Sequence, residues 1–165
     1  MNNDREELAQ SIAALARDKA LVIVAAESVT AGSVSTALAS GSDASEWLAG
    51  SIVAYSTELK RRLLGVTTAD VFTPECAREM AMGALAASGA TLVVAVTGVG
   101  GPERMDGHPA GEVHICVGGP ESLRVFTHQF AGAPRDVVEQ ATLEALKHVK
   151  GAAHAEPEAP SRISR

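Results

Sequence analysis

The sequence is poor in aromatic residues and cysteines, and it has no long apolar run. Aromatic residues make up 3% of the 165 residues, although hydrophobic residues reach 46%. The core must therefore consist mainly of Ala, Val, Leu and Ile, which suits helices packed closely on a sheet. A surface of aromatic platforms for stacking nucleic-acid bases is disfavoured. No apolar run approaches the roughly 20 residues that a membrane-spanning helix needs.

The two cysteines and the N-terminus favour a cytoplasmic protein. Cys76 and Cys116 lie far apart and have no metal-ligand spacing, so we expect buried thiols in a reducing compartment. The opening residues, MNNDREELAQ, are polar and acidic. They contain neither the basic segment nor the apolar segment of a signal peptide, and none is expected.

The formal net charge of −6 limits the classes of molecule that the protein is expected to bind. An acidic chain repels polyanions at long range, so we expect neither a nucleic acid nor a membrane as partner. A small anionic molecule such as a nucleotide remains compatible, because backbone N–H groups can bind it locally. Helix faces rich in Ala favour packing between subunits, and we expect a homo-oligomer.

The apolar patterning predicts one α/β domain over 1–150. Short apolar runs predict strands at 21–26, 51–55, 91–97, 110–118 and 123–130, and helical spacing predicts helices at 5–18, 30–39, 56–64, 74–88 and 134–149. This order predicts a three-layer αβα sandwich with a mixed, largely parallel sheet and a C-terminal β-hairpin. The polar, Pro-containing segment 151–165 is predicted to be a disordered tail.

The segment AAESVTAG, residues 25–32, joins a buried strand to a helix. Functional residues concentrate at the carboxyl ends of strands in such sheets, and Ser28 lies at this turn. Free N–H groups at the helix start can bind a phosphate or the oxyanion formed when a hydroxyl attacks an amide. The simpler alternative is that Ser28 or Thr30 only caps the helix.

The segment YSTELK, residues 55–60, places Tyr55 at a strand end and Lys60 one helical turn later. A lysine acts as a general base only when it is neutral, which requires burial or a nearby positive charge. The Tyr55 hydroxyl can relay the proton and hold the resulting ammonium. The alternative is that Lys60 belongs to a solvated basic face with Arg61 and Arg62.

The glycines of TGVGGP, residues 97–102, follow a strand and can line a ligand with N–H groups. The segment lacks the GK[ST] of a P-loop and the third glycine of a dinucleotide motif, so an ordinary turn is an equal alternative. Neither His108, His114 nor His128 has zinc-ligand spacing, and no metal is expected. Arg135 and Gln140 can reach a phosphate or ribose from the last helix.

Taken together, these segments resemble the CinA C-terminal domain family, the nicotinamide-nucleotide amidases. The matching segments, in order, are AESVTAG (26–32), YSTELK (55–60) followed by Leu64-Gly65, EMAMGAL (79–85), AVTGVGGP (95–102), PAGEV (109–113) and RDVVEQA (135–141). Their order and spacing hold over roughly residues 5–149.

The resemblance implies hydrolysis of nicotinamide mononucleotide to nicotinic acid mononucleotide and ammonia, without a metal or cofactor. It makes Ser28 the nucleophile, Lys60 the general base and Tyr55 its partner, with the oxyanion on the N–H groups of Val29 and Thr30. The residues expected to contact substrate are Glu27, Ala31, Gly32, Thr97, Gly98, Gly100, Gly101, Arg135 and Gln140.

The chain departs from the family pattern at several positions. Val29 replaces Cys, Ala31 replaces Gly, Thr57 replaces Asn, Gly100 replaces Ala, and ERMDGHP (103–109) replaces a glycine-rich run. These changes leave two alternatives open: a pyridine-nucleotide-binding paralogue with impaired catalysis, or an amidohydrolase for another amide.

Overall fold

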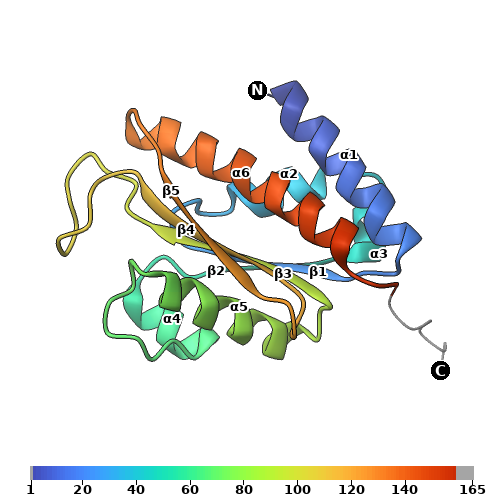
Figure 1. The fold of residues 1–165 in the computed structure, drawn as a ribbon, viewed down its shortest axis with the longest axis horizontal. Helices are drawn as coiled ribbons and strands as arrows, with labels where there is room; N and C mark the ends of the chain where they lie inside the picture. Colours follow the sequence, from blue (N-terminus) through green and yellow to red (C-terminus); the bar gives the residue numbers. More distant parts are fainter. Residues whose placement is uncertain (1, 159–165) are drawn as a thin grey trace.

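A five-stranded sheet runs through the middle of the molecule, with helices on both faces (Figure 1). The computed structural model describes residues 2–158. The strands are β1 Ile23–Glu27, β2 Leu48–Val53, β3 Leu92–Gly98, β4 Glu112–Gly118 and β5 Arg124–Gln129. The helices are α1 Asn2–Asp18, α2 Ser33–Ala39, α3 Ala44–Trp47, α4 Thr57–Leu64, α5 Pro74–Ser88 and α6 Pro134–Ala155.

The strand order is β2-β1-β3-β4-β5. Strands β2, β1 and β3 are parallel, whereas β4 and β5 form an antiparallel hairpin that extends the sheet from β3. The predicted α/β class, mixed sheet and C-terminal hairpin are confirmed. Because the three parallel strands end at the same edge, the segments that follow them meet there.

Each face of the sheet has its own apolar core. Alternate residues of β1, such as Ile23 and Ala25, pack with α1, α2 and α6. The residues between them, Val24 and Ala26, pack with α4 and α5 on the opposite face. Strands covered on both sides need apolar residues at every position, which explains the uninterrupted apolar runs of β1 and β3.

Two predicted boundaries were wrong, and one short helix was not predicted. The second strand covers 48–53 rather than 51–55, because β2 is an edge strand with partly exposed side chains and lacks a continuous apolar signal. Residues 44–47 form the short helix α3, which was not predicted. Helix α2 begins at Ser33 rather than at Thr30, because a turn intervenes after β1.

The last helix extends further than predicted. Residues 151–155, assigned to a disordered tail, belong to α6. Gly151 costs an α-helix only about 1 kcal/mol, and the burial of Ala153 offsets that cost. The Lys19 ammonium also donates to the carbonyls of Ala153 at 3.0 Å and Glu156 at 2.7 Å, which stabilises the helix end. Residues 159–165 of the predicted tail lie outside the described residues.

Between residues 2 and 158, every helix is too short or too polar to cross a bilayer.

Candidate active site

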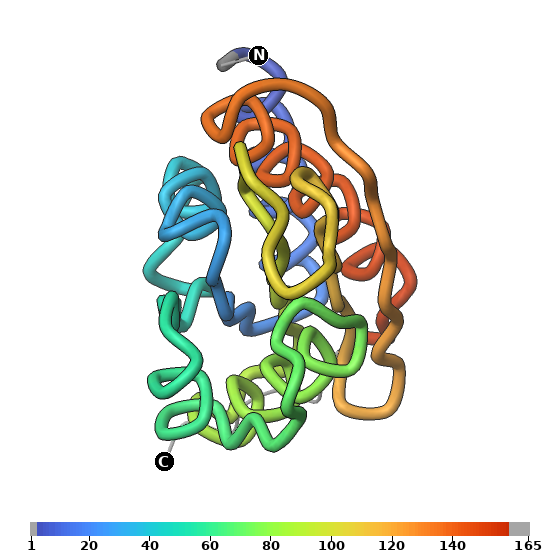
Figure 2. Tube along the Cα trace, turned by 90° about the vertical axis from the view of Figure 1, so that its left-hand side faces the viewer, coloured from blue at the N-terminus to red at the C-terminus, as the bar shows by residue number. Residues whose placement is uncertain are grey.

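A pocket of about 310 Å³ lies at the edge of the sheet where the parallel strands end. Ser28, Tyr55 and Lys60 all line it, although they follow two different strands. The loop after β3 and the start of α6 complete the walls. Figure 2 looks onto this edge, where the yellow loop after β3 lies beside the green segment that precedes α5.

Ser28 is the first residue after β1. Its N–H donates to the Val96 carbonyl at 2.9 Å, which fixes the turn against β3. The side chain is 6% exposed, and within residues 2–158 its Oγ has no hydrogen-bond partner. The N–H groups of Val29 and Thr30 likewise have no acceptor in the described part of the chain. The turn after β1 thus presents the Ser28 hydroxyl and two backbone N–H groups that have no hydrogen-bond partner within residues 2–158.

Lys60 is buried on the first turns of α4, with 2% of its surface exposed. Its Nζ donates to the Tyr55 carbonyl at 3.0 Å, the one hydrogen bond of this amine among residues 2–158. Burial lowers the pKa of Lys60 below its usual value, and the nearby Cys76 thiol opposes this shift only partly. The neutral amine is therefore more accessible here than in a surface lysine. The alternative of a solvated basic face is wrong for Lys60.

Local sequence explains why α4 holds Lys60 in this position. Ser56 caps the helix by accepting from the Leu59 N–H at 3.1 Å, and Gly65 ends it in a left-handed conformation. Gly83 of α5 lies against the last turn of α4. A Cβ atom at Gly83 would lie 2.0 Å from the Leu64 carbonyl oxygen, so this close approach of the two helices requires glycine.

Tyr55 contributes differently from the prediction. Its side chain lines the pocket but is 69% exposed, and its hydroxyl has no partner in residues 2–158. The backbone carbonyl of Tyr55, rather than the hydroxyl, holds the Lys60 amine. The hydroxyl remains free to contact a ligand at the mouth of the pocket.

Glu27 organises the turn and does not line the pocket. Its carboxylate is fully buried and accepts five hydrogen bonds, which come from the hydroxyls of Thr30 and Ser51 and from the N–H groups of Gly32, Val34 and Ser35. The N–H groups at the start of α2, predicted to be free for a ligand, are thus occupied. The carboxylate of Glu27 faces α2, so the structure gives this residue a place in the turn and not in the pocket lining.

Ala31 and Gly32 also lie outside the pocket. Both adopt positive φ, +47° and +102°, and they shape the turn around Glu27. Their expected contacts with substrate stay a prediction. Ala31 carries a backbone strain that glycine would relieve, because a Cβ atom disfavours the left-handed region.

The glycines that follow β3 have two roles: one allows the close approach of β4, and others line the pocket. Gly98 lines the pocket, yet a Cβ there would lie 2.4 Å from the Glu112 carbonyl oxygen, so the approach of β4 requires glycine. Gly100 and Gly101 line the pocket, and their N–H groups have no acceptor in residues 2–158. Thr97 is fully buried, donates to the Val71 carbonyl at 2.8 Å and does not line the pocket.

Helix α6 reaches the pocket through Pro134 and Val138 rather than through the predicted polar residues. Gln140 donates to the carbonyls of Ala131 at 2.8 Å and Asp136 at 2.9 Å, which ties the preceding loop to the helix. Arg135 is exposed beside the pocket wall and pairs with Glu139 at 3.4 Å. Gln140 therefore supports the loop before α6, whereas Arg135 is an exposed side chain in a long ion pair on the helix surface.

Sequence reasoning missed an apolar wall formed by Val71, Phe72 and Met105. Next to this wall, the His108 ring is held between two carboxylates. Its Nε2 lies 2.7 Å from an oxygen of Asp70, and its Nδ1 lies 2.7 Å from an oxygen of Glu112. The hydrogen bonds that the imidazole makes to Asp70 and Glu112 raise the pKa of His108. The only sequence signal was a His and an acid four residues apart, which is common on surfaces.

A family model described as the CinA C-terminal domain matches residues 5–153. The chain belongs to the CinA C-terminal domain family. A CinA superfamily structure from Klebsiella pneumoniae 700603 has a TM-score of 0.87 and 27% identity, covering 92% of this chain and 99% of that chain. The corresponding structure from Escherichia coli has a TM-score of 0.84 and 29% identity, with coverage of 90% and 91%.

Longer CinA relatives contain this domain as one part. A CinA-like protein of Prochlorococcus marinus is 38% identical over 134 residues, covering 78% of this chain and 31% of the relative. A Shouchella clausii protein, provisionally named as competence-damage inducible, is 39% identical over 146 residues, covering 79% and 34%. The chain thus spans about one third of the length of these curated relatives.

Several CinA motif residues serve the fold. Glu79 of EMAMGAL accepts from the N–H groups of Thr67 and Thr68 at 2.9 and 3.0 Å, closing the loop after α4. Desolvation opposes ionisation, but these hydrogen bonds lower the pKa of Glu79 to about 2. Among the departures from the motifs, Val29, Thr57 and Gly100 line the pocket. The substituted loop adds Met105 to the lining, so these departures lie on the walls of the pocket that contains Ser28.

Proposed function

We propose that this CinA-family domain hydrolyses the carboxamide of nicotinamide mononucleotide, releasing ammonia and nicotinic acid mononucleotide. The observation that carries the proposal is a buried amine, Lys60, in the same pocket as an unpartnered serine hydroxyl, Ser28. Serine activated by a neutral lysine is a known arrangement for attacking amides. The substrate itself rests on the resemblance of the motifs.

In the proposed acylation, neutral Lys60 takes the proton of Ser28 Oγ as Oγ bonds to the carboxamide carbon. The resulting oxyanion accepts hydrogen bonds from the N–H groups of Val29 and Thr30, which have no acceptor among residues 2–158. The Lys60 ammonium then protonates the nitrogen as the C–N bond breaks, and ammonia leaves. A single preorganised oxyanion donor is worth about 3–4 kcal/mol of barrier.

In the proposed deacylation, water attacks the acyl-enzyme and Lys60 again acts as the base. Lys60 removes a proton from the water as its oxygen bonds to the acyl carbon. The second oxyanion uses the same two donors. The Lys60 ammonium returns its proton to Oγ as the ester bond breaks, which restores Ser28 and frees the carboxylic acid. The acid then ionises in solvent.

The pocket offers separate environments for the parts of a nucleotide. Phe72 and Met105 form an apolar wall on which a pyridine ring can pack. The N-terminal ends of α4 and α6 both face the pocket through Thr57 and Pro134, and helix starts favour anions. We assign the 5′-phosphate to the start of α6, where the exposed Arg135 can approach it.

Ammonia release from nicotinamide mononucleotide by wild type and Ser28→Ala tests the proposal. We expect Ser28→Ala to lower kcat at least about 1,000-fold, because the acyl bond cannot form. Ser33→Ala is the matched control, since Ser33 begins α2 outside the pocket. Wild-type turnover by a folded Ser28→Ala protein would refute the scheme.

The same assay separates the two alternatives. A paralogue with impaired catalysis would bind nicotinamide mononucleotide in calorimetry without releasing ammonia from it. An amidohydrolase of another specificity would release ammonia from a different member of a panel of amides, and its activity would still depend on Ser28. Activity on nicotinamide mononucleotide that Ser28→Ala removes would support the proposed substrate.

A further inference from the structure

A second cluster of chemically reactive side chains lies outside the candidate active site. His128 projects from β5, and Glu144 and His148 project from adjacent turns of α6. One ligand atom from each residue lies within 4.8 Å of the others. The two Nε2 atoms form a hydrogen bond of 3.0 Å with each other, and a shared metal ion would replace the proton between them. None of the three residues lines the pocket that contains Ser28.

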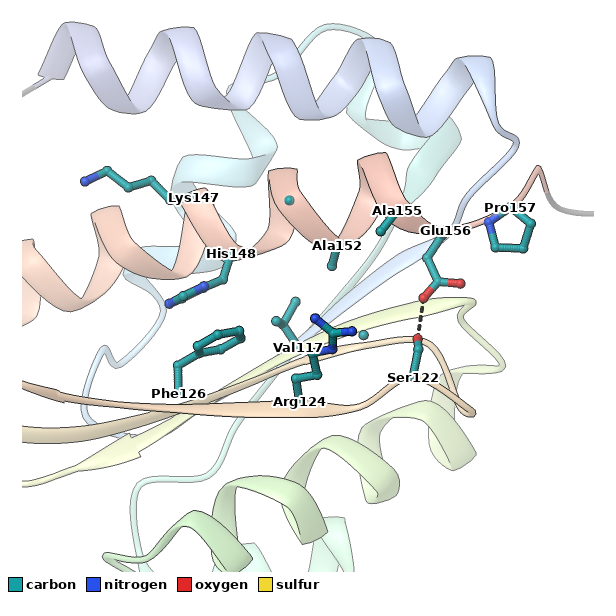
Figure 3. A pocket seen from close by; sticks show the side chains of 12 residues that line it. Val117, Ser122, Arg124, Phe126, Lys147, His148, Ala152, Ala155, Glu156 and Pro157 are labelled. Carbon is teal, nitrogen blue, oxygen red and sulfur yellow. Dashed lines mark hydrogen bonds between the residues drawn. The ribbon is translucent and has the colours of Figure 1, made fainter.

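Aromatic neighbours orient both imidazole rings. His148 stacks on Phe126 with ring centroids 4.0 Å apart, and Figure 3 shows these two side chains facing each other between α6 and β5. His128 stacks on Phe130 with centroids 5.3 Å apart and planes inclined by only 6°. The rings are therefore held with their Nε2 atoms converging, and they need no large rearrangement to share a ligand.

The donor types of the cluster suit a cation. Neutral imidazole is the form that binds metals. The Glu144 carboxylate is partly buried and supplies a negative charge, although one of its oxygens accepts from the Lys147 ammonium at 2.7 Å. Lys147 thus competes with any cation for Glu144.

We propose that His128, Glu144 and His148 form a binding site for a divalent transition metal of the zinc class. Two imidazole nitrogens and one carboxylate are a standard zinc donor set. In a tetrahedral site, bonds of about 2.0–2.1 Å place ligand atoms about 3.3 Å apart, close to the present Nε2 separation. A small movement of Glu144 completes three ligands.

A hollow of about 510 Å³ lies beside His148, between β5 and the C-terminal half of α6. His148, Arg124 and Lys147 line it, together with Phe126 (Figure 3). A water molecule or a small anion can therefore reach a bound metal. The site would join the edge strand β5 to α6, so occupancy should stabilise the sheet against that helix.

No metal was expected from the sequence, because the spacing of the histidines along the chain does not match a zinc motif. Here the donors come from a strand and a helix, and only Glu144 and His148 have a recognisable separation of one helical turn. This separation is typical of exposed helices as well, so it does not by itself predict a site.

Calorimetric titration of the tag-free protein with ZnCl2 tests the proposal. Wild type should bind one zinc ion per chain and show a higher Tm, whereas MgCl2 should have no effect because Mg²⁺ prefers oxygen ligands. His148→Gln and Glu144→Gln should each weaken zinc binding at least tenfold. His154→Gln is the matched control, because His154 is exposed on the same helix outside the cluster.

A gain-of-affinity variant makes the test independent of folding defects. Lys147→Met leaves all three ligands in place and removes the competing ammonium, so zinc binding should tighten. Circular dichroism would confirm that each variant is folded. The proposal is overturned if wild type does not bind zinc at 100-fold excess, if His148→Gln binds it equally well, or if Lys147→Met binds it more weakly.

Discussion

Glu27 and Lys60 are two buried ionisable groups at the same edge of the sheet, but they are solvated very differently. The Glu27 carboxylate accepts five hydrogen bonds from the turn that follows β1. The Lys60 amine makes one hydrogen bond, to a backbone carbonyl. A buried charge with many partners is stabilised, whereas one with few partners tends to lose its charge.

This difference separates a structural group from a reactive one. Glu27 replaces its lost hydration with fixed dipoles and thereby builds the turn that presents Ser28. Lys60 lacks such compensation, and burial lowers its pKa. The domain therefore combines a fully satisfied carboxylate with an under-solvated amine, and the first positions the nucleophile that the second is proposed to activate.

Of the substitutions considered, Lys60→Met is expected to have the largest effect, which is a loss of catalytic activity. Loss of the base should lower kcat for ammonia release at least about 1,000-fold. Because the buried amine is poorly compensated, the free energy of unfolding should stay the same or rise by roughly 1–2 kcal/mol. Denaturant unfolding and the ammonia assay measure both. A large loss of stability would show that Lys60 is structural, like Glu27.

Glu27→Gln should have the opposite profile. The amide supplies one acceptor oxygen and turns an N–H donor toward groups that are themselves donors. We expect the free energy of unfolding to fall by roughly 2–4 kcal/mol, as measured in urea. Glu58→Gln, an exposed carboxylate on α4, is the control and should change stability by less than about 0.5 kcal/mol. Wild-type stability in Glu27→Gln would contradict the comparison.

The pH dependence of activity should report the Lys60 amine. With a pKa below the usual 10.5, the neutral fraction rises as pH increases, so kcat/KM should increase about tenfold per pH unit below that pKa and then level off. Folding stability should also rise with pH between the folded pKa and 10.5, since the unfolded chain binds the extra proton there. Residual Lys60→Met activity should lack the ascending limb.

Ala31→Gly should have the smallest effect. Ala31 lies in the Glu27-bound turn with φ +47°, and glycine removes the Cβ penalty at a modest entropic cost in the unfolded chain. We expect roughly 0.5–1 kcal/mol of added stability and less than a twofold change in kcat. Ala20→Gly, with φ +54° and far from the pocket, is the matched control. Loss of activity in Ala31→Gly alone would place this residue in substrate binding.

Apolar patterning predicted the layers and sheet type because strands buried on both faces need apolar residues at every position. Strand β2 lies at the edge of the sheet and has partly exposed side chains, so it lacks a continuous apolar run. Its predicted bounds were therefore wrong. The end of α6 was also missed, because the carbonyls that Lys19 binds belong to a helix more than a hundred residues away in sequence.

Residue types predicted which segments meet at the site, but their local contacts were not predictable. Nothing in YSTELK distinguishes a buried Lys60 from a solvated one, because α5 determines its burial. Likewise, AES does not show that the Glu27 carboxylate turns toward α2 and away from the pocket. The wall of Phe72 and Met105 lies next to His108, whose two carboxylate partners lie on different segments.

The Lys60 pKa, measured directly, tests the central claim. In protein labelled with ¹³C at lysine Cε, NMR titration would follow each amine, and Lys60→Met would identify the Lys60 signal. We predict that Lys60 titrates below the value of about 10.4 of an unperturbed lysine and loses its proton within the pH range in which the protein remains folded. A Lys60 amine that titrates at about 10.4 or above would contradict its role as the base.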